Sequence, residues 1–224
     1  MGIEDKVVLI TGGSGGLGQT VVPAFLSAGA RVISGDLNPL PVQPAGVMAI
    51  TADVTDHADA QRLVNEAIRT SGRIDALINL VGGFAAGRVV ETDMSTWQRM
   101  LTMNLTSAFS LSKAVLPHML ERRMGRIVHV AARAALEPFP GAAAYIVSKS
   151  GLVALIRTLS IELSGLGVTV NGVLPNTIDT PGNRKAMPDA DPSKWVRPEA
   201  IAQTLIFLAS DEAIQINGAL IPIG

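Results

Sequence analysis

The chain has 224 residues and a formal net charge of −1, and 48% of its residues are hydrophobic. This length suits one α/β domain spanning residues 1–224, and the near-zero charge argues against nucleic acid and acidic membranes, whose phosphates require a surplus of lysine and arginine. The absence of cysteine excludes disulfides and thiolate metal sites.

Runs of valine, isoleucine and leucine alternate along the chain with segments of helical period. In chain order we expect a strand at 6–11, a helix at 16–29, strands at 31–36 and 47–53, a helix at 58–72, a strand at 74–82, a helical stretch at 95–123 that breaks near Asn104, a strand at 125–132, a helix at 143–164, a strand at 168–175, a helix at 198–209 and a strand at 218–223. Continuous apolar strands between helices indicate a parallel sheet covered on both faces. The crossover rule then predicts a Rossmann-type, doubly wound α/β fold that binds ligands beyond the carboxyl ends of its strands.

The sequence shows no sign of a signal peptide, a membrane span or a metal site. The first residues lack a charged and then apolar order, and no apolar run approaches the ~20 residues of a span, so we expect a cytoplasmic protein. The three histidines, His57, His118 and His129, do not pair at ligand spacing. Residues 175–197, rich in proline and aspartate, are expected to form a long loop that binds substrate.

The glycine-rich segment TGGSGGLG, residues 11–18, lies between the first expected strand and the first expected helix. Glycines there let the backbone approach a pyrophosphate, which the free amides and the positive helix end would stabilise. A flexible turn is the alternative. Asp36, at the end of the second strand, favours a dinucleotide site, because its carboxylate can accept hydrogen bonds from both ribose hydroxyls. It would repel a 2′-phosphate, and Gly15 stands where a basic residue would neutralise one, so NAD(H) is favoured and NADP(H) is the alternative.

The chain resembles the short-chain dehydrogenase/reductase family along essentially its whole length, on several motifs in the same order. They are TGGSGGLG (11–18), ADV (52–54), NLVG (79–82), MNL (103–105), YIVSK (145–149) and PNTIDTP (175–181). The last departs by one residue from the family's Pro-Gly-x-x-x-Thr. The resemblance implies a classical member of the family, an NAD(P)-dependent oxidoreductase with a small-molecule substrate.

The resemblance implies a catalytic group of Tyr145, Lys149 and Asn104. Tyr145 would be the general acid that gives a proton as hydride arrives, and since a phenol has a pKa of ~10, a nearby cation must assist it. Lys149 lies one helical turn further on the same face and would supply that charge while holding the nicotinamide ribose. Asn104 would bind the water of a proton relay that reaches Lys149.

The resemblance also implies contacts with the cofactor along the carboxyl edge of the sheet. Asp53 and Val54 would hold the adenine, and Ile178 and Thr180 the carboxamide. The full set of expected cofactor contacts is Gly12, Ser14, Gly15, Gly16, Leu17, Gly18, Asp36, Leu37, Asp53, Val54, Asn79, Leu80, Val81, Gly82, Tyr145, Lys149, Pro175, Thr177, Ile178 and Thr180.

The serine that polarises the substrate carbonyl in this family is missing, because its position, thirteen residues before Tyr145, is occupied by Ala132. Ser148 lies in a variable position of the Tyr-Lys motif and does not replace it. Loss of one oriented donor costs ~2.7–4 kcal/mol, so the protein either binds NAD(H) without turnover or reduces a substrate that needs no such donor. Residues 174–195 and 81–87 are similar to segments of dihydropteridine reductases, which also have alanine in place of this serine.

Three functions remain open. The first is an NADH-dependent reductase of a quinonoid dihydropteridine-like or other activated substrate, with Phe84, Arg133 and Trp195 as candidate substrate contacts. The second is a general carbonyl or alcohol oxidoreductase, and the third, from another class, is a catalytically silent NAD(H)-binding protein that reports redox state. The apolar faces of the helices at 100–123 and 144–164 predict a homodimer or homotetramer.

Overall fold

One parallel sheet runs through the computed structural model, which describes residues 2–41 and 43–224. The sheet has seven strands in the order β3-β2-β1-β4-β5-β6-β7, and every neighbouring pair is parallel. The strands are β1 (Val7–Thr11), β2 (Arg31–Asp36), β3 (Met48–Thr51), β4 (Ala76–Asn79), β5 (Gly125–Val130), β6 (Val168–Pro175) and β7 (Leu220–Ile223). The chain reverses its winding direction between β1 and β4, which creates the crevice where doubly wound folds bind ligands.

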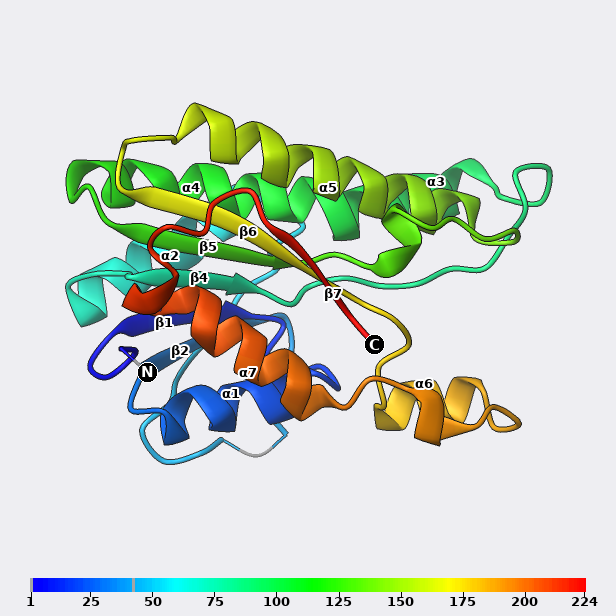
Figure 1. The fold of residues 1–224 in the computed structure, drawn as a ribbon, viewed down its shortest axis with the longest axis horizontal. Helices are drawn as coiled ribbons and strands as arrows, with labels where there is room; N and C mark the ends of the chain where they lie inside the picture. Colours follow the sequence, from blue (N-terminus) through cyan, green and yellow to red (C-terminus); the bar gives the residue numbers. More distant parts are fainter. Residues whose placement is uncertain (1, 42) are drawn as a thin grey trace.

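Helices cover both faces of this sheet (Figure 1). One face carries α1 and α7, the other carries α2, α4 and α5, and α3 packs beside α5. The helices are α1 (Gly18–Ser27), α2 (His57–Ser71), α3 (Met94–Leu101), α4 (Ser107–Glu121), α5 (Ala143–Glu162) and α7 (Pro198–Ala209). Because successive strand residues point to opposite faces, β1 supplies Val7 and Leu9 to one core and Val8 and Ile10 to the other. The Rossmann-type doubly wound α/β fold is confirmed.

The long helical stretch expected at 95–123 breaks where the sequence predicted a break. A π-helical turn, Thr102–Thr106, joins α3 to α4 and contains the fully buried Asn104. Such turns interrupt the regular hydrogen-bond ladder and occur frequently at functional sites. The irregular backbone therefore coincides with a candidate catalytic residue.

The segment at 175–197, expected to be a long loop, contains two short helical elements. It contains a short helix, α6 (Pro181–Ala186), and a 3-10 turn, Pro192–Lys194. The Thr180 hydroxyl caps α6 by accepting a hydrogen bond from the Asn183 amide at 3.2 Å. A proline in the first turn, after a threonine cap, explains why a helix starts there. The segment forms an ordered lobe beyond the carboxyl edge of the sheet (Figure 1).

Helix α5 is more apolar than the sequence analysis allowed. An 18-residue window within it has a mean hydropathy of 1.3, so by length and composition it could cross a bilayer, contrary to the expectation that no such run exists. In this fold 44% of that window is buried, and the helix packs along β6 and α3. Packing inside the protein accounts for its composition.

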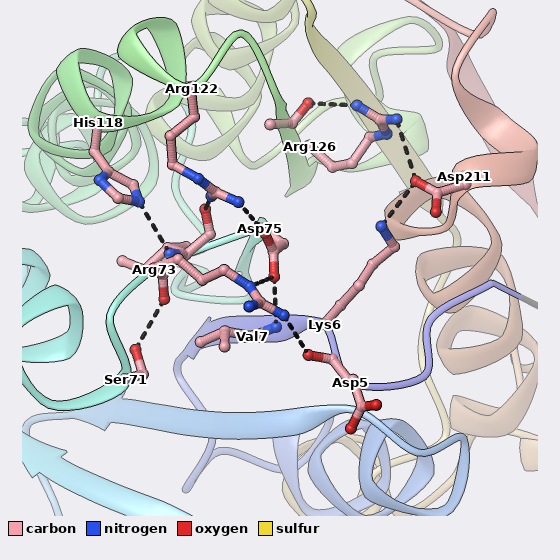
Figure 2. A network of polar contacts seen from close by, with 12 residues as sticks. Asp5, Lys6, Val7, Ser71, Arg73, Asp75, His118, Arg122, Arg126 and Asp211 are labelled. Atoms are coloured by element: carbon pink, nitrogen blue, oxygen red, sulfur yellow. Dashed lines mark hydrogen bonds and ion pairs between the residues drawn. The ribbon is translucent and has the colours of Figure 1, made fainter.

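At the amino edge of the sheet, the buried Asp75 joins the start of β1 to the end of α4 (Figure 2). Its carboxylate accepts hydrogen bonds from the Val7 amide at 2.9 Å and from Arg73 and Arg122 at 2.8 Å each. Burial alone would raise the pKa of Asp75, but these donors together lower it. A charged network thus holds the edge that lies opposite the candidate site.

Candidate active site

The glycine-rich loop turns tightly between β1 and α1 at the carboxyl edge of the sheet. Gly12 has a φ of +78°, and a Cβ there would lie 3.0 Å from the Val81 amide nitrogen, so a side chain would be both strained and crowded. A Cβ on Gly16 would lie 3.0 Å from the Cβ of Thr180. The loop therefore packs between the residues that follow β4 and the lobe at 175–197.

Several amides of this loop are available to a ligand. The amides of Gly16 and Leu17 make no hydrogen bond to any residue that the structure describes, and no side chain caps the start of α1. Free amides at the positive end of a helix, without side chains in front of them, match the needs of a pyrophosphate. The residues present fit the dinucleotide that the sequence predicts.

Asp36 lies at the end of β2, beside the glycine loop. Its carboxylate accepts hydrogen bonds from the Ser14 amide at 3.0 Å and from the Asn38 amide at 3.1 Å. The Ala52 amide donates to the backbone oxygen of Asp36 at 2.9 Å, which brings Asp53 close to it. The candidate contacts for ribose and adenine thus lie together at the ends of β2 and β3.

The neighbouring candidates differ in how free their side chains are. The Asp53 carboxylate accepts hydrogen bonds from the Thr55 amide at 2.9 Å and from the Thr55 hydroxyl at 2.6 Å, so it is engaged in its own turn. Val54 is buried, whereas Leu37 is 60% exposed beside Asp36.

The residues after β4 lie between the glycine loop and the candidate catalytic group. The Leu80 amide donates to the Thr11 backbone oxygen at 3.0 Å. A Cβ on Gly82 would lie 2.9 Å from the Asn104 side-chain oxygen and 3.0 Å from the Lys149 Nζ. Glycine at this position lets both polar groups approach the main chain.

The catalytic candidates are brought together from the π-helical turn and α5. Lys149 is only 5% exposed, and its Nζ donates a hydrogen bond to the Val130 backbone oxygen at 2.9 Å. The Asn104 side chain accepts from the Gly83 amide at 2.9 Å and donates to the Gly83 oxygen at 3.0 Å. The Asn104 amide therefore clamps the loop that borders Lys149.

Burial sets the protonation of the tyrosine and the lysine. It raises the pKa of Tyr145 to about 12 and lowers the pKa of Lys149 to about 8. We expected Lys149 to lower the tyrosine pKa, but its ammonium is directed at the Val130 oxygen and the Tyr145 ring packs against Phe84. At neutral pH the phenol keeps its proton, and most of the lysine is charged.

Of the three expected substrate contacts, one touches Tyr145 directly. The rings of Phe84 and Tyr145 meet with centroids 5.0 Å apart. Arg133 instead donates to Glu137 at 2.8 Å and to the Gly224 backbone oxygen at 2.9 Å. Trp195 is half-buried after the 3-10 turn, without a ring contact to any aromatic residue in the described part of the chain.

Residues 6–191 match the sequence model of the family described as short chain dehydrogenase. The chain belongs to the short-chain dehydrogenase family. It is 31% identical over 240 residues to the 3-oxoacyl-(acyl-carrier-protein) reductase of Thermotoga maritima, covering 100% of this chain and 98% of that protein. It is 34% identical over 239 residues to the meso-2,3-butanediol dehydrogenase of Serratia marcescens, covering 100% and 94%. The ligand-free structure of Thermoplasma acidophilum aldohexose dehydrogenase matches with a TM-score of 0.91 at 28% identity, over 98% of this chain and 92% of that one.

These relatives are named dehydrogenases and reductases, and this short-chain dehydrogenase is accordingly an NAD(P)-dependent oxidoreductase. Its substrate is a small molecule. The comparisons favour an enzyme over the catalytically silent NAD(H)-binding protein.

Ala132 occupies the position where the family resemblance leads us to expect a serine. The residue has an extended backbone, with φ −160° and ψ 150°, and is 5% exposed. Its methyl group offers no donor to a substrate oxygen.

Among residues 2–41 and 43–224, no group of three or more histidine, aspartate and glutamate side chains could hold a metal ion.

Ser148 belongs to the site, although the sequence analysis set it aside. Its fully buried hydroxyl accepts a hydrogen bond from the Asn104 side chain at 3.0 Å and donates to the Tyr145 backbone oxygen at 2.7 Å. It thereby ties the π-helical turn to α5. The only sequence signal was its place directly before Lys149.

Proposed function

We propose that this enzyme is an NADH-dependent reductase that transfers hydride to a quinonoid dihydropteridine-like or other activated substrate. The observation that carries the proposal is a half-buried Tyr145, packed against Phe84 with ring centroids 5.0 Å apart, in a site where position 132 is alanine. The phenol can give a proton, while Ala132 cannot polarise a carbonyl. An electron-poor conjugated imine accepts hydride without that donor.

Each catalytic residue has a distinct task in this proposal. A bound nicotinamide supplies the hydride. Tyr145 gives its phenolic proton to the substrate. Lys149 keeps one hydrogen bond to the Val130 oxygen, and its remaining N–H donors would hold the nicotinamide ribose and place a positive charge on the side of the site where the phenolate forms. Asn104 clamps Gly83 and orders the water that returns a proton toward Lys149.

The exposed ring of Phe84 beside Tyr145 favours a flat substrate. Phe84 touches Tyr145, and yet 57% of it is exposed. Its loop is fastened to the segment before α5 by a parallel bridge between Gly87 and Ala142, so the ring is held in place. We assign the lobe at 175–197 to the other side of the substrate, with Trp195 as a second aromatic contact.

Asp36 supports NADH over NADPH. Backbone amides of Ser14 and Asn38 orient its carboxylate beside the glycine loop, where it can accept hydrogen bonds from both ribose hydroxyls. A 2′-phosphate would meet a negative charge there. Ile178 and Thr180 complete the proposed cofactor site at the carboxamide.

A second candidate function is a general carbonyl or alcohol oxidoreductase. The names of the relatives favour it, since they include a 3-oxoacyl-(acyl-carrier-protein) reductase and a butanediol dehydrogenase. Ala132 opposes it, because one missing oxyanion donor costs ~2.7–4 kcal/mol in the transition state.

A substrate panel separates these functions. Oxidation of NADH and NADPH is followed with quinonoid dihydropterin, quinones and simple ketones. Turnover of the pterin or another activated acceptor, with simple ketones inert, supports the first function, and efficient reduction of simple ketones supports the second. Tyr145→Phe should lower kcat by about 100-fold or more. Unchanged turnover in that variant contradicts the role of Tyr145.

We also propose a cytoplasmic homodimer or homotetramer. Large apolar side chains are exposed on α4 and α5, with Phe109 49%, Val147 46% and Ile161 76% accessible. A second copy packed on these helices would bury them. Light scattering that gives the mass of a monomer would contradict the assembly.

A further inference from the structure

The buried histidine of β5, His129, lies beneath the candidate site and has no task in the proposed reaction. It is 0% exposed, and burial, with the charge of Lys149 as a second cause, lowers its pKa to about 3. The imidazole is therefore neutral near pH 7. Its Nδ1 lies 3.3 Å from the Asn79 side-chain nitrogen, and its Nε2 lies 3.1 Å from the Ser112 hydroxyl.

The neighbours of Asn79 determine how its amide is oriented. The side-chain oxygen accepts hydrogen bonds from the Thr11 hydroxyl at 2.8 Å and from the Val81 amide at 3.2 Å. A backbone amide can only donate, so the oxygen must face Val81 and the nitrogen must face His129. Nδ1 of His129 therefore accepts a hydrogen bond.

The other ring nitrogen then carries the proton. The Ser112 hydroxyl gives its own hydrogen to the Ala108 backbone oxygen at 2.7 Å, so it accepts from Nε2 of His129. The hydrogen bonds thus run in one consistent direction between Asn79, His129, Ser112 and the Ala108 oxygen. Without the imidazole, no other residue that the structure describes accepts a hydrogen bond from the Asn79 side-chain nitrogen.

The Asn79 end of this chain supports the glycine loop. Thr11 directly precedes Gly12, and the Val81 nitrogen lies 3.0 Å from the Cβ position of Gly12. The next residue, Gly82, borders the Lys149 ammonium. A rotated Asn79 amide would release Thr11 and Val81, which lie on either side of Gly12.

We propose that His129 is a positioning residue for the cofactor, which acts by fixing Asn79 and thereby the main chain beneath the glycine loop. The inference rests on the proposed placement of NADH over that loop. His129 touches neither the reacting atoms nor the cofactor, and it acts through hydrogen bonds alone.

Two substitutions of the full-length protein test this role. His129→Leu keeps an apolar volume and removes both hydrogen bonds, and it should weaken NADH binding about tenfold, or about 1.4 kcal/mol. The kcat at saturating NADH should change little. His129→Asn can again offer Asn79 an acceptor and should recover most of the affinity. NADH titration gives the Kd, and steady-state kinetics separate KM from kcat.

His118 provides the matched control. Its Nε2 accepts a hydrogen bond from the Ile74 amide at 3.2 Å at the opposite edge of the sheet (Figure 2). His118→Leu should therefore lower the melting temperature and leave the Kd for NADH unchanged. An unchanged Kd in His129→Leu, or an equal loss in His118→Leu, overturns the inference. A wild-type protein that does not bind NADH overturns the proposed function instead.

Two milder substitutions test the same role if the His129→Leu variant does not fold. Ser112→Ala removes the acceptor of Nε2 and should weaken NADH binding about threefold. Ser160→Ala removes a comparable buried hydroxyl, which donates to the Arg157 oxygen at 2.8 Å on α5, and should leave the Kd unchanged. Equal values for the two variants contradict the role of His129.

Discussion

The rings of Phe84 and Tyr145 meet edge to face, with centroids 5.0 Å apart and planes inclined at 69°. The contact joins the loop after β4 to α5 and covers one side of the half-buried phenol, whose pKa desolvation raises to about 12. The rest of the Phe84 ring is open to solvent. One aromatic pair can therefore serve both proton delivery and recognition of a flat substrate.

Removing this ring should affect the substrate and not the cofactor. We expect Phe84→Ala to raise the KM for the flat substrate about three- to tenfold, because an aromatic pair contributes ~0.5–1.5 kcal/mol beyond its buried area. The KM for NADH should stay the same. Ile214→Ala, at a residue that is 56% exposed beyond α7, is the control. An increase in both KM values for Phe84→Ala would contradict a specific role.

The pH profile of reduction should report the titration of Lys149. Its pKa is about 8, so the ammonium is present below that pH and is lost as the pH rises through it. Tyr145, with a pKa of about 12, stays protonated over the same range. The rate should therefore be constant near neutral pH and fall above about pH 8.

Lys149→Arg separates this titration from other causes. Arginine keeps its charge beyond pH 10, so the variant should lose the fall above about pH 8, at a reduced kcat. A fall at the same pH in Lys149→Arg would show that another group titrates.

The cofactor preference should depend on the charge of Asp36. Asp36→Asn keeps the size of the side chain and removes its charge, so we expect the KM for NADH to rise about tenfold. The KM for NADPH should fall, because the repulsion of its 2′-phosphate disappears. Parallel titrations with both cofactors give the ratio of the KM for NADPH to the KM for NADH. If this ratio is the same in Asp36→Asn and in the wild type, Asp36 does not determine the cofactor preference.

Most of the sheet could be predicted from the sequence, because most strands are short runs of apolar residues between glycines and polar residues. The position of the glycine-rich loop at 11–18, after a strand and before a helix, could also be predicted. Helix α6 could not be predicted by period, since its six residues are too few to show one. The apolar α5 showed that composition does not distinguish a core helix from a membrane span.

Tyr145 and Lys149 could be proposed as catalytic candidates from the sequence, because they are one helical turn apart and match the family's Tyr-x-x-x-Lys. Their protonation could not be predicted, because it depends on burial, which only the packed structure shows. Ser148 and His129 make hydrogen bonds to Asn104 and Asn79, which lie on other elements. Such long-range pairs leave no pattern in a single sequence.

Restoring the missing hydroxyl is the sharpest test of the substrate argument. Ala132 has the extended backbone that a serine also adopts, so Ala132→Ser places a donor where the resemblance implies a serine, without changing the main chain. We expect kcat/KM for a simple ketone to rise at least about tenfold, since one oriented donor contributes ~2.7–4 kcal/mol to the transition state.

Two further variants show whether this gain uses the proposed site. Ala131→Ser puts a hydroxyl on the neighbouring residue, whose side chain packs into the core, and should give no gain. Adding Tyr145→Phe to Ala132→Ser should abolish the gain, because the polarised carbonyl still needs a proton. If Ala132→Ser leaves ketone reduction unchanged while it binds NADH normally, then the missing serine is not what sets the substrate.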